Sequence, residues 1–303
     1  MQTNLAPSRR RRGRMMRYAG VVVVAAIGPA ALLAAPAYAS GLVFKSGTDI
    51  VATLSTAQAH NATAAPSGSA AVVISAVGET LSAGTGCTQS GAAVICPLGS
   101  QDTITLNGGD LSDTLTKTVN ARGKFNGGSG DDTLNAGPSP SGNTLSGGPG
   151  RDTLSGGAGG EFMDGGTGPD TFNGGPGPDI VTYQISGAGV TVTIDNAAND
   201  GTTGEGDNVR SDVETIYGSP FGDTVTGSSA QDIFLGFDGD DRLNGGPGPD
   251  ILVGGAGKDT LRGEGGDDRL EANDNAGGDL ADGDIGFDTC LTESTDTRSS
   301  CEA

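Results

Sequence analysis

A nine-residue unit repeats from residue 218 to residue 270 without any change in length, and this repeat limits what the chain can fold into more than any other feature. Residues 236–244, 245–253 and 254–262 each begin with glycine, place aspartate at the sixth position and place a large apolar residue at the eighth. A short fixed period of this kind is typical of a solenoid, in which each unit stacks on other units instead of folding alone. We therefore predict an all-β solenoid.

Two ladders with a step of nine residues run through the repeat. The apolar ladder consists of Ile216, Val225, Phe234, Leu243, Leu252, Leu261 and Leu270. The acidic ladder consists of Asp223, Asp232, Asp241, Asp250, Asp259 and Asp268. Two units should make one coil with a strand on each side, so each turn stacks on the turn two units away. Asp232, Asp250 and Asp268 are then expected in one row, and the other three aspartates in a second row.

The residue types suit a turn that binds a hard cation. Glycines reach backbone angles that other residues avoid, so six residues can turn tightly with their carbonyl oxygens inward. The last three residues form a strand whose alternation sends only the apolar side chain inward. Stacked strands lie roughly 4.8 Å apart, and aspartates at that spacing repel each other unless a cation such as calcium lies between them. Calcium would therefore be part of the fold.

The same unit occurs less regularly between residues 107 and 181. Residues 127–134 form a complete unit, but residues 116–125 lack the aspartate. Residues 136–145 are two residues too long and have Asn143 in the acidic position. From residue 145 to residue 181 the step of nine is strict.

The last unit, residues 283–290, places Asp288 in the acidic position and Cys290 in the apolar position. A terminal unit of a solenoid is expected to be atypical, because an unfinished end would expose strand edges.

We predict several calcium ions, bound by the acid at the sixth position and by carbonyl oxygens of glycines at the first and fourth positions. The predicted acidic ligands are Asp113, Asp132, Asp152, Glu161, Asp170, Asp179, Asp223, Asp232, Asp241, Asp250, Asp259, Asp268 and Asp288. The predicted glycine ligands are Gly127, Gly130, Gly147, Gly150, Gly165, Gly168, Gly174, Gly177, Gly236, Gly239, Gly245, Gly248, Gly254, Gly257, Gly263 and Gly266.

Charge and composition agree with this interpretation. The formal net charge is -20, with 55 glycines, no tryptophan and one histidine, so the chain can build little conventional core and nucleic acid is not an expected partner. Residues 1–39 differ, because six arginines precede a short apolar stretch and an Ala-Tyr-Ala cleavage motif that ends at Ala39. These features predict a secretory signal peptide, with a single membrane anchor as the alternative, so no membrane span is expected in the mature chain.

Four cysteines in an exported chain predict two disulfides. Cys87 and Cys96 flank one short segment, and Cys290 and Cys301 flank the C-terminal tail. Sequential pairing is favoured among the three possible connectivities, and free thiols are the alternative.

Two segments fall outside the repeat. Residues 41–44, 50–54, 71–74 and 103–106 are typical of short strands, and we expect a flexible loop at residues 57–71 with His60 in solvent. Residues 182–217 contain strand-like stretches around an acidic loop, residues 195–207, which is either solvated or an additional weak calcium site.

The predicted organisation follows from these boundaries. It comprises a signal peptide (1–39), a β-rich N-terminal module (40–106), a first repeat block (107–181), an insertion (182–217), a second repeat block (218–290) and a C-terminal tail (291–303).

Residues 107–290 resemble the hemolysin-type calcium-binding (RTX repeat) proteins, because about thirteen units share the spacing, the turn glycines, the acid and the apolar position. The resemblance implies a right-handed parallel β-roll that folds on binding calcium outside the cell. It also raises the alternative of a hydrolase with appended repeats. The chain has no H-E-x-x-H, no G-x-S-x-G and a single histidine, so we expect no enzymatic activity and no Ser-His site.

A surface adhesin or ice-binding solenoid is another alternative. Threonine recurs before the apolar position, but it is interrupted by Phe162, Ile180, Ile233, Arg242, Ile251 and Arg269. Strand propensity explains such threonines, so we expect a structural or interaction role whose protein or glycan partner the sequence does not specify.

Overall fold

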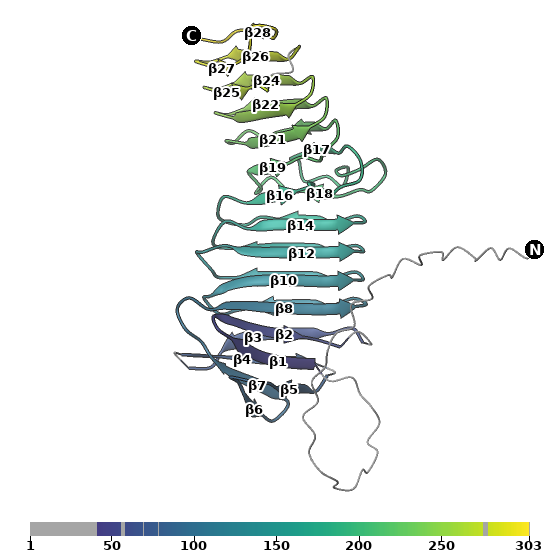
Figure 1. Cartoon of the computed structure of the whole chain (residues 1–303), viewed down its shortest axis with the longest axis vertical. Coiled ribbons are helices and arrows are strands. Elements are labelled where there is room, and N and C mark those ends of the chain that lie inside the picture. Colours follow the sequence, from purple (N-terminus) through teal and green to yellow (C-terminus); the bar gives the residue numbers. More distant parts are fainter. Residues whose placement is uncertain (1–40, 56–57, 69, 78, 275–277, 303) are drawn as a thin grey trace, which may run out of the picture. The chain divides into compact units, whose positions relative to one another are not determined.

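The computed structural model describes residues 41–55, 58–68, 70–77, 79–274 and 278–302, and this part of the chain is all-β (Figure 1). The predicted signal peptide and its cleavage site lie outside the described residues. The described part contains no helix, and thus none that could cross a membrane.

Three sheets contain all the described strands, and the strands of each sheet are given in the order in which they are hydrogen-bonded. The first sheet consists of β27 (Thr289–Leu291), β25 (Arg269–Glu271), β23 (Ile251–Ala256), β21 (Ile233–Asp238), β19 (Thr215–Tyr217), β16 (Ile180–Thr182), β14 (Phe162–Thr167), β12 (Asn143–Pro149), β10 (Arg122–Ser129), β8 (Thr103–Asp110), β2 (Asp49–Thr53), β1 (Gly41–Ser46) and β5 (Leu81–Ala83). The second sheet consists of β18 (Asn208–Val209), β15 (Thr171–Asn173), β13 (Thr153–Gly157), β11 (Thr133–Gly137), β9 (Thr114–Lys117), β3 (Asn61–Pro66), β4 (Ala71–Val77), β7 (Ala93–Pro97) and β6 (Thr88–Ser90). The third sheet consists of β17 (Thr191–Thr193), β20 (Thr224–Thr226), β22 (Arg242–Pro247), β24 (Thr260–Gly265), β26 (Leu280–Ile285) and β28 (Thr297–Ser299).

Strands stack in parallel with the predicted step of two units. Ile233 pairs with Ile251, and Ile251 pairs with Arg269, so these coils of the second block take 18 residues. Arg269 pairs with Thr289, so the last coil takes 20. Phe125 pairs with Leu145, which shows that the coil containing the overlong unit takes 20. The prediction of two units per coil is confirmed, and the fold is a parallel β-roll.

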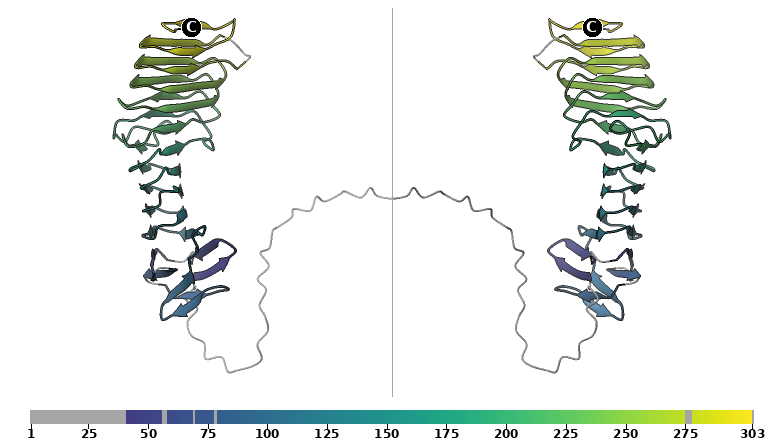
Figure 2. Two further views of the ribbon diagram at one scale, coloured as in Figure 1. Left: turned by 90° about the vertical axis from the view of Figure 1, so that its left-hand side faces the viewer. Right: turned by 90° about the vertical axis from the view of Figure 1, so that its right-hand side faces the viewer.

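The interior of the roll is one column of apolar side chains. The ladder from Ile216 to Leu270 is buried throughout, with each side chain at most 1% exposed. Residues on either side of each ladder residue face away from the core, because successive side chains alternate across a strand. In Figure 2 the strands of the first block are seen almost end-on as two columns, whereas the green and yellow strands of the second block lie across the view. Successive strands thus turn along the stack, as the twist of sheets requires.

The insertion marks the place where the third sheet replaces the second sheet along the roll. The second sheet ends at β18 and the third sheet begins at β17, while the first sheet continues past both strands. Val192 in β17 and Val209 in β18 are each fully buried, so a single coil contributes an inward side chain to both sheets.

The N-terminal module contains strands at all four predicted positions. The prediction of a flexible loop at residues 57–71 is wrong. Its described residues include β3, which pairs with β4 in a hairpin and with β9 of the first repeat coil. The prediction that His60 lies in solvent is also wrong. His60 is only 4% exposed, because it directly precedes β3 and lies beside β9 in the second sheet.

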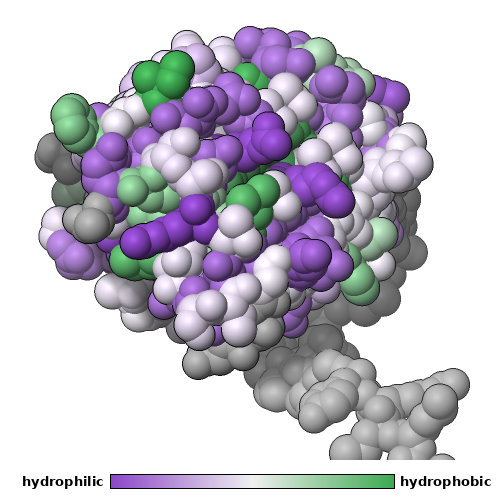
Figure 3. All heavy atoms as spheres, turned by 90° about the horizontal axis from the view of Figure 1, so that it is seen from above, coloured by the Kyte–Doolittle hydropathy of each residue, from purple (hydrophilic) through white to green (hydrophobic). Residues whose placement is uncertain are grey.

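Both predicted disulfides are present, Cys87–Cys96 and Cys290–Cys301, and no free cysteine remains among the described residues. Cys290 takes the apolar position next to Leu270 in the first sheet, and β28 adds a last strand to the third sheet. Figure 3 looks onto the C-terminal end, where hydrophilic and hydrophobic residues are interspersed. The tail therefore covers the end of the roll, as the atypical last unit predicts.

Candidate metal centres

Acidic side chains of stacked turns form continuous rows in which each backbone N–H donates to the carboxylate of the next coil. Asp232 N donates to Asp250 Oδ1 and Asp250 N to Asp268 Oδ1, both at 2.8 Å. Asp223 N likewise donates to Asp241, and Asp241 N to Asp259. The two predicted rows of the second block therefore exist.

The rows extend further than the regular repeat predicts. Asp268 N donates to Asp288, and Asp259 N donates to Asp279, which lies 20 residues later. In the first block the row of Asp113, Asp132, Asp152 and Asp170 ends on Asp207 from the insertion. Asp207 and Asp279 were missed as site residues because their spacing departs from nine. Each is an aspartate that directly precedes a strand, and this is the signal that could have identified them.

Most row acids are buried and leave one carboxylate oxygen without a hydrogen-bond partner. Each of these side chains is at most 2% exposed. The unpartnered oxygens are Oδ2 of Asp113, Asp132, Asp152, Asp170, Asp179, Asp241, Asp250, Asp259, Asp268, Asp279 and Asp288, and Oδ1 of Asp232. A buried carboxylate oxygen with no partner is costly, so a row of them indicates a ligand.

Backbone carbonyl oxygens lie beside these carboxylates. A Cβ atom at Gly236 would be 2.0 Å from Asp241 Oδ2 and 2.4 Å from the carbonyl oxygen of Gly254 in the next coil. Gly147 is related to Asp152 and Gly165 in the same way. Because the first-position glycines have no side chain, a carboxylate oxygen and a carbonyl oxygen from adjacent coils can lie close to one point, which suits a hard cation.

The fourth-position glycines shape the turn. All eight predicted there have positive φ values, namely Gly130, Gly150, Gly168, Gly177, Gly239, Gly248, Gly257 and Gly266. At Gly257 a Cβ atom would lie 1.9 Å from the carbonyl oxygen of Gly239, so the coils approach too closely for any side chain.

Two predicted ligands are less suitable than the rest. Glu161 accepts hydrogen bonds from Asn143 Nδ2 on Oε1 and from Gly157 N on Oε2, both at 2.8 Å. Asp223 accepts from Ser219 on both oxygens. These two acids already have partners within the protein, so they have less need of a cation.

Electrostatics in the rows favour neutral or cation-bound carboxylates. Burial and, to a smaller extent, the neighbouring row acids raise the pKa of Asp241 and Asp250 to about 7, although backbone hydrogen bonds act to lower it. Burial likewise raises the pKa of Asp170 to about 8. A cation between the coils would remove this penalty by neutralising the carboxylates.

The donor set is mainly backbone. Within the described ranges no three His, Cys, Asp or Glu side chains gather closely enough to hold a metal by themselves. Any bound ion must therefore take carbonyl oxygens in addition to one or two carboxylates, which fits calcium and its preference for many oxygen ligands.

The acidic loop of the insertion is not simply solvated. Asp200 and Asp207 are each 2% exposed. Asp200 accepts from the N–H groups of Thr193 and Val209, and Asp207 accepts from Asp170 N and the Tyr183 hydroxyl. The expectation of a solvated loop is wrong for these two acids. Since every one of their oxygens has a partner, neither presents the unpartnered oxygen seen in the rows.

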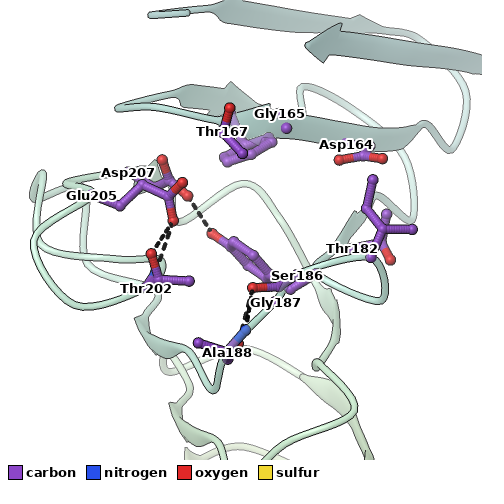
Figure 4. A pocket seen from close by; sticks show the side chains of 14 residues that line it. Asp164, Gly165, Thr167, Thr182, Ser186, Gly187, Ala188, Thr202, Glu205 and Asp207 are labelled. Carbon is purple, nitrogen blue, oxygen red and sulfur yellow. Dashed lines mark hydrogen bonds between the residues drawn. The ribbon is translucent and has the colours of Figure 1, made fainter. Parts of the chain in front are cut away.

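A cavity of about 320 Å³ adjoins this loop. In Figure 4, Thr202, Glu205 and Asp207 from the loop line one side of the cavity, Asp164 from β14 lies on the other side, and Thr167 from β14 lies near Asp207. Glu205 accepts from Thr202 and from Gly168 N, so it ties the loop to the last regular coil of the first block.

The single histidine lies in a buried polar network. Its Nε2 is 3.2 Å from Ser55 Oγ and its Nδ1 is 2.9 Å from Asp113 Oδ1. Ser55 is close to His60 in the sequence, whereas the coil brings Asp113 to the histidine from a distant part of the chain. Ser55 is only 9% exposed and the His60 side chain is fully buried, so the network is enclosed.

Comparison with known proteins agrees with the rows and turns. The family model described as RTX calcium-binding nonapeptide repeat (4 copies) matches residues 124–138, 139–172, 164–182, 217–252, 245–276 and 253–290. A search of curated proteins found no match. The matched residues contain the positive-φ glycines and, apart from Asp113, the unpartnered aspartates described above, and through them residues 124–290 belong to the family of RTX calcium-binding nonapeptide repeats.

Proposed function

We propose that this protein is a secreted calcium-binding β-roll that folds on binding several calcium ions outside the cell and acts as a structural or interaction protein rather than an enzyme. The rows of buried aspartates with unpartnered oxygens support this function most strongly. The predicted carboxylates that have an unpartnered oxygen and the predicted glycine carbonyls, together with Asp279, would hold the ions. Each site then contributes about 1.4 kcal/mol to stability when calcium is at ten times its Kd.

Equilibrium dialysis of the full mature chain against calcium tests the proposal. Several ions per chain are expected, with much weaker binding of magnesium, which demands a smaller and more regular shell of ligands. Binding of fewer than two calcium ions, or equal binding of magnesium, would contradict it.

Secretion is supported by the two disulfides and by the arginine-rich start of the chain. Mass spectrometry of exported protein should find a chain that begins at Ser40 with all four cysteines resistant to alkylation. A chain that keeps its first 39 residues would count against export by a cleaved signal.

A second candidate function is binding to a regular surface such as ice. Thr114, Thr133, Thr153 and Thr171 are successive Cα partners on the outward face of the second sheet. The interrupting residues expected from the sequence lie on the other two sheets, so this threonine row is continuous.

A parallel row runs beside it on the same face. It consists of Thr116, Asn135, Ser155 and Asn173, in which Asn135 Nδ2 donates to Thr116 and Asn173 Nδ2 donates to Ser155. Growth of ice crystals in the presence of the calcium-loaded protein tests this function. Thr153→Lys should abolish any inhibition and Thr260→Lys on the third sheet should not, whereas equal effects would exclude the face.

A further inference from the structure

Two buried acids near the N-terminus, Asp102 and the first row aspartate Asp113, differ from the later row acids because basic side chains contact them. Lys45 forms an ion pair with Asp102, and His60 Nδ1 hydrogen bonds to Asp113. From Asp132 onward, the row carboxylates make no ion pair with a basic side chain in the described part of the chain. The change coincides with the first complete glycine turn at residue 127.

Asp102 lies at the start of the first coil but outside the row, two residues before Ile104, which is the residue that pairs with Gly123 of the next coil. It directly precedes β8, is 7% exposed, and accepts from Gly99 N at 2.7 Å as well as from Lys45. Burial alone would raise the pKa of Asp102, but the hydrogen bond from Gly99 and the charge of Lys45 outweigh burial and lower it. Lys45 Nζ also donates to the carbonyl oxygen of Pro97, so this ammonium group takes both a carboxylate and a carbonyl oxygen.

Lys117 is a second basic side chain inside the roll. It is fully buried, points inward two residues after Leu115 in β9, and its Nζ donates to the carbonyl oxygen of Val119 at 3.1 Å. A Cβ atom at Gly123 would lie 2.8 Å from Lys117 Cε and 3.0 Å from Asn143 Oδ1. The lysine therefore lies where two successive coils lack a row carboxylate, since Gly123 and Asn143 replace the acids there.

His60 closes the start of the other row. Its N–H and its Nδ1 both bond to Asp113 Oδ1, and its Nε2 lies 3.4 Å from Glu79 Oε2. One histidine thus contacts Oδ1 of the first row aspartate on one side and a buried glutamate on the other. Asp113 Oδ2 has no partner and lies near the carbonyl oxygen of Gly127, so Asp113 marks the border with the calcium-binding coils.

We propose that residues 41–125 form a metal-independent end of the roll, in which Lys45, His60 and Lys117 take the part that calcium takes in later coils. This inference rests on the proposed calcium-dependent folding of residues 127–290. The metal-independent end is folded before calcium arrives and offers its exposed strand edges as a template. The calcium-binding coils then add to it one at a time, because each coil of a solenoid contacts only its neighbours.

Hydrogen exchange of the full mature chain, followed by mass spectrometry, tests the inference. In chelator, peptides of β1, β2, β4 and β8 should stay protected while peptides of β14 and β21–β24 exchange rapidly. Calcium should protect both groups. Rapid exchange of the N-terminal peptides in chelator overturns the inference and leaves calcium-dependent folding intact. Protection of every peptide in chelator overturns the proposed function, so the two failures are distinguishable.

Variants that remove a positive charge test whether Lys45 and Lys117 stabilise the metal-independent end. Lys45→Gln and Lys117→Gln keep a donor group but lose the ammonium charge, and Lys124→Gln is the matched control because Lys124 is exposed on β10. In chelator, peptides around β8 and β10 should exchange at least about tenfold faster in the first two variants, because each loses a charged hydrogen-bonding group next to buried acceptors. The control should match the parent. Equal exchange in all three variants would contradict the assignment, even if every variant folds in calcium.

Discussion

At the scale of single residues, the site depends on aspartates that have one oxygen committed to the protein and one without a partner. Asp250 shows this well, because its Oδ1 accepts from Asp232 N while its Oδ2 accepts from no group. Glu161 has the same place in a row, yet both its oxygens have partners. The two residues therefore provide a direct comparison of acids with and without a free ligand atom.

Asp250→Asn should lose about two bound calcium ions per chain, because Asp250 lies between Asp232 and Asp268 and borders an ion position on each side. Glu161→Gln removes the same charge but should leave the number of bound ions unchanged. Equilibrium dialysis at a calcium concentration that just saturates the parent measures both. Equal losses in the two variants would show that unpartnered oxygens do not define the sites.

The raised pKa values predict a pH dependence for the calcium-free chain. Burial raises the pKa of Asp170 to about 8 and that of Asp241 and Asp250 to about 7, from 3.8. Because the folded state favours the protonated form, their contribution to stability is complete below about pH 3.8 and is lost as the pH rises through 7 to 8.

After calcium is removed on a chelating resin, the far-UV strand signal should therefore be larger at pH 5 than at pH 8.5. Adding calcium at pH 8.5 should restore it. A calcium-free signal that is equal at both pH values, or larger at pH 8.5, would contradict the role assigned to carboxylate burial.

At the scale of the turn and strand, close contact between coils explains why glycine recurs at the fourth position. Gly257→Ala should destabilise the calcium-loaded protein by at least about 1–3 kcal/mol, since φ is +149° and a Cβ atom would collide with the Gly239 carbonyl. Gly265→Ala is the control, because a Cβ atom there meets no atom within 4 Å and should change stability by less than about 0.5 kcal/mol. Thermal unfolding in excess calcium compares the two, and similar midpoints would show that the turn tolerates a side chain.

The strands and turns of residues 218–270 could be predicted because every unit there has the same length. The period places Asp232, Asp250 and Asp268 in one row without any knowledge of distances. Asp279 and Asp207 escaped the pattern because the coils that contain them are longer, and a period cannot locate a residue after an insertion. The hydrogen bond that each receives from the preceding row residue reveals them.

The N-terminal module was harder to predict for a different reason. β3 consists of Asn61-Ala-Thr-Ala-Ala-Pro66, in which alanine and proline have low strand propensity, so the segment resembles a loop. It is a strand because β4 and β9 pair with it on either side. His60 is buried for the same reason, because its contacts with Asp113 and Glu79 come from other coils that local sequence does not reveal.

At the scale of the whole roll, few apolar side chains oppose many buried carboxylates. Each coil contributes single inward residues such as Leu243 and Leu252, and the rows place unpartnered oxygens between neighbouring coils. Apolar burial stabilises the stack, but the charged rows oppose it until a cation neutralises them. Folding of residues 127–290 and calcium binding should therefore be one coupled event.

Far-UV circular dichroism of the full mature chain at pH 8, recorded in excess chelator and in millimolar calcium, tests this coupling most directly. Extracellular calcium modules bind at roughly 0.1–1 mM, so this range should span the transition. We predict a large gain in strand signal with calcium and little gain with the same concentration of magnesium. Spectra that superimpose in chelator and in calcium would contradict calcium-coupled folding of this protein.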